Sequence, residues 1–90
     1  MKLVLTSDVK RKLREIKRKT PKLSEKIHKK LELFVDNPKH PSLRNHKLKG
    51  NLKDAWSISI EKDLRMLCYF DEDGVIFFDI GTHDQVYNRK

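Results

Sequence analysis

The chain has 90 residues, a length that suits one domain and leaves no room for a second hydrophobic core, so we expect residues 1–90 to form a single unit. It carries 21 lysines and arginines against 13 acidic residues, which gives a net charge of +8. Such a basic domain is expected to bind a polyanion, an acidic protein or both, although a charge that serves solubility alone is the alternative. No apolar run is long enough for a membrane span or a signal peptide, and the single Cys68 excludes an internal disulfide. These features predict a cytoplasmic protein.

The positive charge is concentrated in the first part of the sequence. Residues 1–53 contain 17 basic and 5 acidic side chains, a net charge of +12, whereas residues 54–90 contain 4 and 8, a net charge of −4. The first part is therefore expected to form the electrostatic surface that meets a partner.

The N-terminal region predicts a strand followed by two helices. Residues 3–5 are apolar and suit a short strand, after which Ser7 or Asp8 can cap a helix. Thr20 and Pro21 interrupt this helix, because the residue before proline is pushed out of the helical region. A second helix is expected to start near residues 22–24 and to stop at residues 36–38. The apolar residues with helical spacing are Val9, Leu13 and Ile16 in the first helix and Leu23, Ile27, Leu31, Phe34 and Val35 in the second.

Residues 37–54 read as a long basic loop, and three strands are expected after it, over residues 55–61, 64–70 and 75–80. Tight turns join these strands into an antiparallel meander. The sequence thus predicts an α+β fold with an N-terminal strand, a two-helix hairpin and a three-stranded meander. Both helices are expected on one face of an antiparallel sheet, and the other face is expected to stay open.

Alternation along the strands assigns side chains to the two sheet faces. The residues expected to face the helices are Trp56, Ile58, Ile60, Met66, Cys68 and Phe70. Those expected on the open face are Ser57, Ser59, Glu61, Asp63, Arg65, Leu67 and Tyr69. A solvated face with a routine ion pair is the simpler reading of this polar set.

Histidine is the residue type that exchanges protons near neutral pH, and two of the four histidines are candidates for that role. His83 follows directly after an apolar strand, and His46 lies in the basic loop. The alternative for both is an ordinary exposed histidine, which is our expectation for His28 and His40.

The sequence contains none of the motifs that are typical of metal sites, phosphate-binding loops or serine nucleophiles. The sequence has no paired metal-ligand spacing, no glycine-rich phosphate loop and no nucleophile elbow around a serine. We therefore expect no metal and no cofactor, and either metal-free acid–base chemistry or none. RNA suits the first case, because its own 2′-hydroxyl can serve as the nucleophile.

Three segments resemble the RelE/ParE superfamily of type II toxins, and most closely its YafQ-like branch of mRNA interferases. They are His46-Lys-Leu-Lys-Gly50, then Trp56-Ser-Ile-Ser-Ile-Glu61-Lys-Asp63-Leu-Arg65, then Asp79-Ile-Gly-Thr-His83-Asp-Gln-Val-Tyr87. The resemblance implies a RelE-like fold and a ribosome-dependent endoribonuclease that cleaves mRNA in the A site and is neutralised by a cognate antitoxin. This sequence departs from the family pattern at Ser59, where such toxins carry histidine, and at Leu64, where they carry tryptophan.

The resemblance also implies roles for single residues. His83 would be the general acid, His46 a base or phosphate contact, and Asp63 a base or an orienting partner. Arg65 would stabilise the phosphate and Tyr87 would stack on or position the RNA. Candidate contacts to the RNA backbone are Lys47, Lys49, Lys53, Arg11, Arg14 and Arg18.

Three other functions remain open at this stage: a ParE-like toxin that poisons DNA gyrase, an RNA-binding member of the fold without catalysis, and a decayed toxin that only binds its antitoxin. An antitoxin segment that is acidic or amphipathic would fit the basic helices or the open sheet face.

Overall fold

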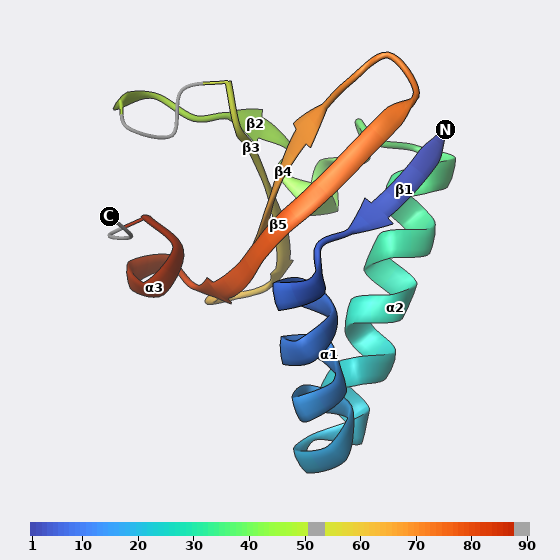
Figure 1. The fold of residues 1–90 in the computed structure, drawn as a ribbon, viewed down its shortest axis with the longest axis vertical. Helices are drawn as coiled ribbons and strands as arrows, with labels where there is room; N and C mark the ends of the chain where they lie inside the picture. The colour runs from blue at the N-terminus through green and yellow to red at the C-terminus, as the bar shows by residue number, and fades with distance from the viewer. Residues whose placement is uncertain (51–53, 88–90) are drawn as a thin grey trace.

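The computed structural model describes residues 1–50 and 54–87 and confirms the predicted α+β order (Figure 1). The elements are β1 (Lys2–Leu5), α1 (Ser7–Lys19), α2 (Pro21–Asp36), the 3-10 turn η1 (Pro41–Leu43), β2 (His46–Lys47), β3 (Trp56–Glu61), β4 (Leu64–Phe70), β5 (Gly74–Thr82) and α3 (His83–Tyr87). Among the described residues, no helix is long and apolar enough to cross a membrane.

The sheet has five strands in the order β1-β5-β4-β3-β2. The meander β3-β4-β5 is antiparallel as predicted, but β1 runs parallel to β5, with Leu3 opposite Val75 and Leu5 opposite Phe77. The expectation of a purely antiparallel sheet is therefore wrong. Gly74 permits this pairing, because a Cβ at that position would lie 1.9 Å from the Lys2 carbonyl oxygen.

The two long helices begin slightly earlier than their sequence signals suggest. Thr6, and not Ser7 or Asp8, caps α1, since its hydroxyl accepts a hydrogen bond from the Val9 amide at 3.3 Å. The second helix, α2, starts at Pro21 and not near residues 22–24. Proline fits the first position of a helix, where the missing amide hydrogen has no partner to lose.

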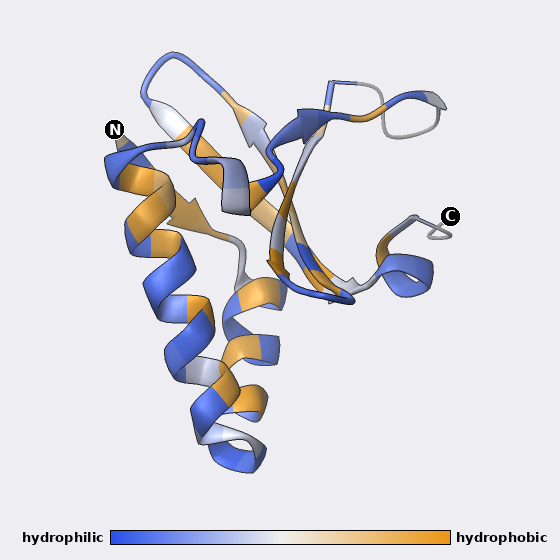
Figure 2. Cartoon of the chain, turned by 180° about the vertical axis from the view of Figure 1, so that it is seen from behind, coloured by the Kyte–Doolittle hydropathy of each residue, from blue (hydrophilic) through white to orange (hydrophobic). Residues whose placement is uncertain are grey.

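The core lies between the sheet and the α1–α2 hairpin. Figure 2 shows apolar residues along the strands and on the sheet-facing sides of both helices, whose outer surfaces are hydrophilic. Phe34 of α2 is fully buried and packs edge-on against Phe77, with ring centroids 5.4 Å apart. Phe70, predicted for the core, contacts Phe34 and Trp56 but keeps 42% of its surface exposed, because it sits at the last position of β4.

The opposite sheet face is partly covered, which corrects the expectation of an open face. Helix α3 packs against β4 and β5 on the side away from α1 and α2 (Figure 1). Leu67, predicted to point outward into solvent, is fully buried, as is Val86 of α3. Gly81 allows α3 to fold back this closely, because a Cβ there would lie 3.1 Å from the Gln85 Cβ atom and 3.3 Å from a Val86 methyl carbon.

The predicted 37–54 loop contains two short elements within its described part. The 3-10 turn η1 packs on β3, and β2 extends the sheet by pairing His46 with Ser57 and Lys47 with Trp56. His40, expected to be solvated, is half-buried at the start of η1, where its Nδ1 atom accepts a hydrogen bond from the Ser42 amide at 3.2 Å.

Candidate active site

The partly covered sheet face brings together residues that lie far apart in the sequence. Because antiparallel partners point to the same face, the pairing of His46 with Ser57 places both side chains on the α3 side of the sheet. The Tyr87 hydroxyl reaches down from α3 and donates a hydrogen bond to the buried Ser57 Oγ atom at 2.7 Å. Ser57 is therefore both the hydrogen-bond partner of Tyr87 and the strand partner of His46.

His83 joins this group through Tyr87. It is the first residue of α3, its ring meets the Tyr87 ring edge-on with centroids 4.3 Å apart, and 58% of its side chain is exposed. The Asp84 carboxylate lies 3.7 Å from its Nδ1 atom. His83 thus contacts Tyr87 directly, His46 is linked to Tyr87 through Ser57, and both histidines are exposed to solvent.

The backbone around His46 determines which of its nitrogens can act as a base. His46 Nδ1 lies 2.7 Å from the Arg44 carbonyl oxygen, which can only accept a hydrogen bond. Nδ1 therefore carries the hydrogen, and in the neutral ring the lone pair resides on Nε2. This arrangement leaves Nε2 available to take a proton.

Arg65 and Asp63 lie at the end of the sheet where α3 begins. Arg65 is half-buried and pairs with Ser59 on β3 and with Gly81 on β5. Asp63 is exposed in the turn before β4, and the pairing of Leu64 with Thr82 puts this turn beside the start of α3. Within the described residues, Asp63 makes no ion pair or hydrogen bond with Arg65.

The predicted polar cluster of the open face is only partly assembled. A register shift between Ser59 and Glu61 reverses the alternation, so that Glu61 turns toward α2 and accepts a bond from Lys26 Nζ at 3.1 Å. Tyr69 lies farther along β4, stacked on Phe78 with ring centroids 4.6 Å apart. Of the cluster, Ser59 and Arg65 remain next to each other.

The candidate RNA-binding residues are scattered. Arg11 pairs with Asp8, and Arg18 pairs with Glu15 at 2.6 Å. The other residues predicted for RNA contact are Arg14, Lys47, Lys49 and Lys53.

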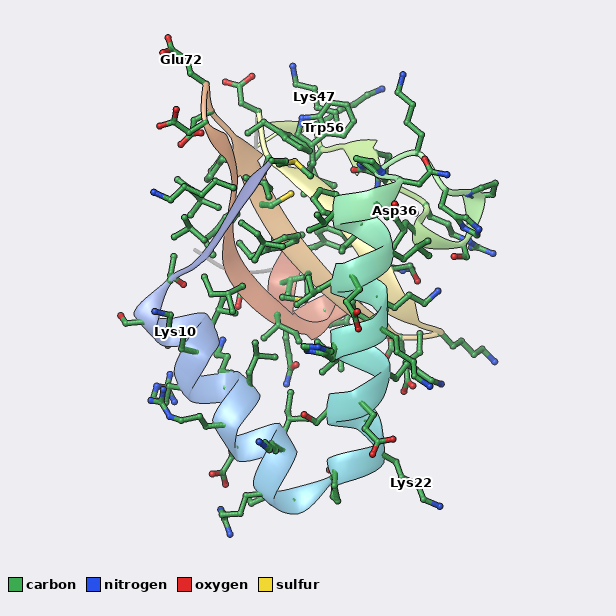
Figure 3. The ribbon with its side chains drawn as sticks, turned by 90° about the vertical axis from the view of Figure 1, so that its right-hand side faces the viewer. Lys10, Lys22, Asp36, Lys47, Trp56 and Glu72 are labelled. Carbon is green, nitrogen blue, oxygen red and sulfur yellow. The ribbon has the colours of Figure 1, made fainter. Side chains whose placement is uncertain are left out.

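Of these four, Arg14 and Lys49 are exposed and without an ion pair among the described residues, and Lys53 lies outside them. Lys47 pairs with Trp56 and so points to the sheet face opposite His46; the two side chains lie near each other in Figure 3. Its Nζ atom lies 3.5 Å from the Asp54 Oδ1 atom.

One ion pair joins strand β5 to the basic helix α1. Lys12 Nζ of α1 lies 3.0 Å from Asp79 Oδ1, whose side chain is largely buried, and this carboxylate raises the pKa of Lys12 above its ordinary value. In the part of the chain that the structure describes, no three histidine, cysteine or acidic side chains come together as metal ligands.

The sequence reasoning missed two features of the site. It assigned no role to Ser57, although the hydroxyl at this position holds Tyr87. It also missed α3, for which a signal exists: Thr82 and Gln85 form a capping box, with the Thr82 amide donating to Gln85 Oε1 at 2.8 Å and the Gln85 amide to Thr82 Oγ1 at 3.2 Å.

Several solved structures share this fold. The YoeB/ParE toxin from Agrobacterium tumefaciens superimposes with a TM-score of 0.78 at 22% identity, covering 92% of this chain and 99% of that one. YafQ from E. coli strain BL21(DE3) gives 0.77 at 17% identity, covering 96% and 97%. The E. coli DinJ-YafQ toxin-antitoxin complex gives 0.75 at 18% identity, covering 96% of each chain.

The sequence comparisons assign the family. No curated protein matches the sequence significantly. Residues 1–88, however, match the family described as bacterial toxin of type II toxin-antitoxin system, YafQ. Because this match spans almost the whole chain and agrees with the fold, the protein belongs to the YafQ family of type II toxins.

Proposed function

We propose that this toxin is an endoribonuclease that cleaves mRNA in the ribosomal A site by metal-free acid–base catalysis. The observation that carries the proposal is that two exposed histidines are both linked to Tyr87, His83 by ring contact and His46 through Ser57. Cleavage of a phosphodiester requires one group that takes a proton and one that donates a proton, and histidine is the side chain best suited to both tasks.

The chemistry uses the RNA's own nucleophile. His46 Nε2 takes the proton of the 2′-hydroxyl, the 2′-oxygen attacks the phosphorus, and the bond from phosphorus to the 5′-oxygen breaks. His83 donates a proton to that leaving oxygen. Arg65 stabilises the extra negative charge on the phosphoryl oxygens. The products are a 2′,3′-cyclic phosphate and a 5′-hydroxyl end. Asp63, in the turn beside the start of α3, is the second candidate for the base or for orienting His83.

Neutralisation by an antitoxin follows from the family and from the charge. The E. coli YafQ structure with DinJ is a toxin–antitoxin complex. The net charge of +12 over residues 1–53 of this chain suits an acidic antitoxin segment. Such a segment can block the toxin by covering the basic helices or the sheet face that carries His46.

Replacement of either histidine tests the proposal. Purified toxin is added to ribosomes programmed with a defined mRNA, and cleavage is mapped together with the chemistry of the new ends. His83→Gln and His46→Gln should each lower the cleavage rate by roughly 100-fold or more. His28→Gln is the matched control, because the His28 side chain on α2 is 78% exposed and, among the described residues, its one ion-pair partner is Glu32. Equal cleavage by all three variants, or 5′-phosphate ends, would contradict the mechanism; toxicity through gyrase without RNA cleavage would favour the ParE-like function.

A further inference from the structure

A second, basic cleft adjoins the candidate active site. It has a volume of about 550 Å³ and its lining includes Lys30, Arg44, Ser59, Lys62 and Arg65. Among the residues that the structure describes, Glu61 is the one acidic residue in its lining, and it is already paired with Lys26 of α2. Within the described residues, Arg44, Lys62 and Arg65 make no ion pair, so their positive charges are available to a ligand.

Two arginines line the cleft together with Ser59. The β2–β3 ladder pairs His46 with Ser57 and continues with a bond from the Leu48 amide to the Ala55 carbonyl. The ladder ends at His46, two residues after Arg44, and Arg44 and Ser59 both line the cleft. Ser59 pairs with Arg65 on β4. Ser59 is therefore a small side chain in a cleft that both arginines line.

The backbone of Arg44 couples this cleft to His46. Arg44 has φ 47° and ψ 42°, the left-handed conformation that arginine rarely adopts. In this conformation it ends η1, and its carbonyl oxygen accepts the hydrogen bond from His46 Nδ1. A conformational cost at a surface position is typical of functional sites. One residue thus orients the histidine with its backbone and offers a cation with its side chain.

We propose that Arg44 and Arg65 bind the RNA phosphate that neighbours the cleaved one. The proposal rests on the proposed function, since it assumes an RNA substrate. Ser57 and Ser59 mark the two positions on the same face, roughly 7 Å apart along β3, which is comparable to the separation of neighbouring phosphates in an extended single strand. The fork of an arginine side chain matches two phosphate oxygens, and the five donors of Arg65 suffice to contact both phosphates.

RNA binding without cleavage tests the cleft. The probe is a fluorescein-labelled single-stranded RNA carrying 2′-O-methyl groups, which removes the nucleophile, and its anisotropy is measured between about 50 and 200 mM salt. Arg44→Gln should weaken binding roughly tenfold, the effect of losing one charge-assisted contact. It should also reduce the slope of log affinity against log salt by about 0.7, the value for one phosphate contact on a single strand.

Two further variants and an unfolding curve isolate the charge at this position. Arg44→Lys retains the charge and should keep the salt slope while binding more weakly than wild type. Lys22→Gln makes the same change of charge at the far end of α2 (Figure 3) and should leave the slope unchanged. All variants should unfold near the wild-type temperature, because the backbone carbonyl that holds His46 is retained.

The outcomes separate this proposal from the proposed function. Weaker RNA binding by Arg44→Gln, together with no cleavage by wild-type toxin on ribosomes, would support the cleft and refute the nuclease. Unchanged RNA affinity and salt slope in Arg44→Gln would overturn the cleft, even if the wild-type toxin cleaves mRNA. Loss of affinity for an acidic antitoxin peptide alone would overturn it as well, since the arginines would then bind carboxylates.

Discussion

The hydrogen bond between Tyr87 and Ser57 should hold the C-terminal helix over the sheet, and its energy can be worked out from the structure. The Ser57 side chain is fully buried and its hydroxyl accepts from the Tyr87 hydroxyl at 2.7 Å. Tyr87→Phe leaves the Ser57 oxygen in an apolar setting without this partner, which costs about 1–3 kcal/mol. For a domain of this size, each kcal/mol corresponds to a shift in Tm of about 4–8 °C.

A double-mutant cycle measures this bond directly. Urea unfolding is recorded for Tyr87→Phe, Ser57→Ala and the double variant. Ser57→Ala should cost less than Tyr87→Phe, because the half-exposed Tyr87 hydroxyl can bond to water instead. The double variant should be more stable than the sum of the single effects implies, by about 1 kcal/mol. Both single variants should also slow RNA cleavage, because a loosened α3 displaces His83. Additive effects, within about 0.3 kcal/mol, would refute the reasoning.

Three further results are expected from the structure. Asp79 raises the pKa of Lys12 above 10.5, so the ion pair stabilises the fold fully below that pH and loses its contribution as pH rises through the raised pKa. The difference in unfolding free energy between wild type and Lys12→Met should therefore shrink in urea titrations at alkaline pH. A constant difference would contradict this. Gly81→Ala should cost about 1–3 kcal/mol in thermal unfolding, since its Cβ would crowd Gln85, and unchanged stability would argue against the close packing of α3. Burial raises the pKa of the Cys68 thiol to about 12, so a thiol reagent at neutral pH should label it only after unfolding; rapid labelling of the folded protein would contradict that burial.

The regular elements were predictable because each has a strong local signal. Apolar spacing marks α1 and α2, alternation marks β3, and Pro38 and Gly74 mark the ends of elements. The position of β1 was not predictable in this way, since its four residues pair with residues of β5 that lie 72 positions later in the chain. Strand pairing at that distance depends on how the helical hairpin packs, which local patterns do not specify.

The site was predictable only as a set of candidates. Single-strand alternation assigned Ser57 and Arg65 to the correct face but failed at Glu61, because a register shift is invisible in the spacing of polar residues. It also failed at Leu67, which α3 covers. The roles of His46 and His83 came from the resemblance to known toxins. Their links to Tyr87 come from β2 and α3, two short elements that the sequence reasoning read as loops.

The central claim is that His46 and His83 act on one phosphodiester, and histidine NMR tests it most directly. The Hε1 resonances of the four histidines are followed while a short RNA with 2′-O-methyl groups is added. We expect the His46 and His83 signals to shift together with a single Kd, while the exposed His28 signal stays in place. Movement of only one of the two, or two different Kd values, would show that these histidines do not share a phosphate.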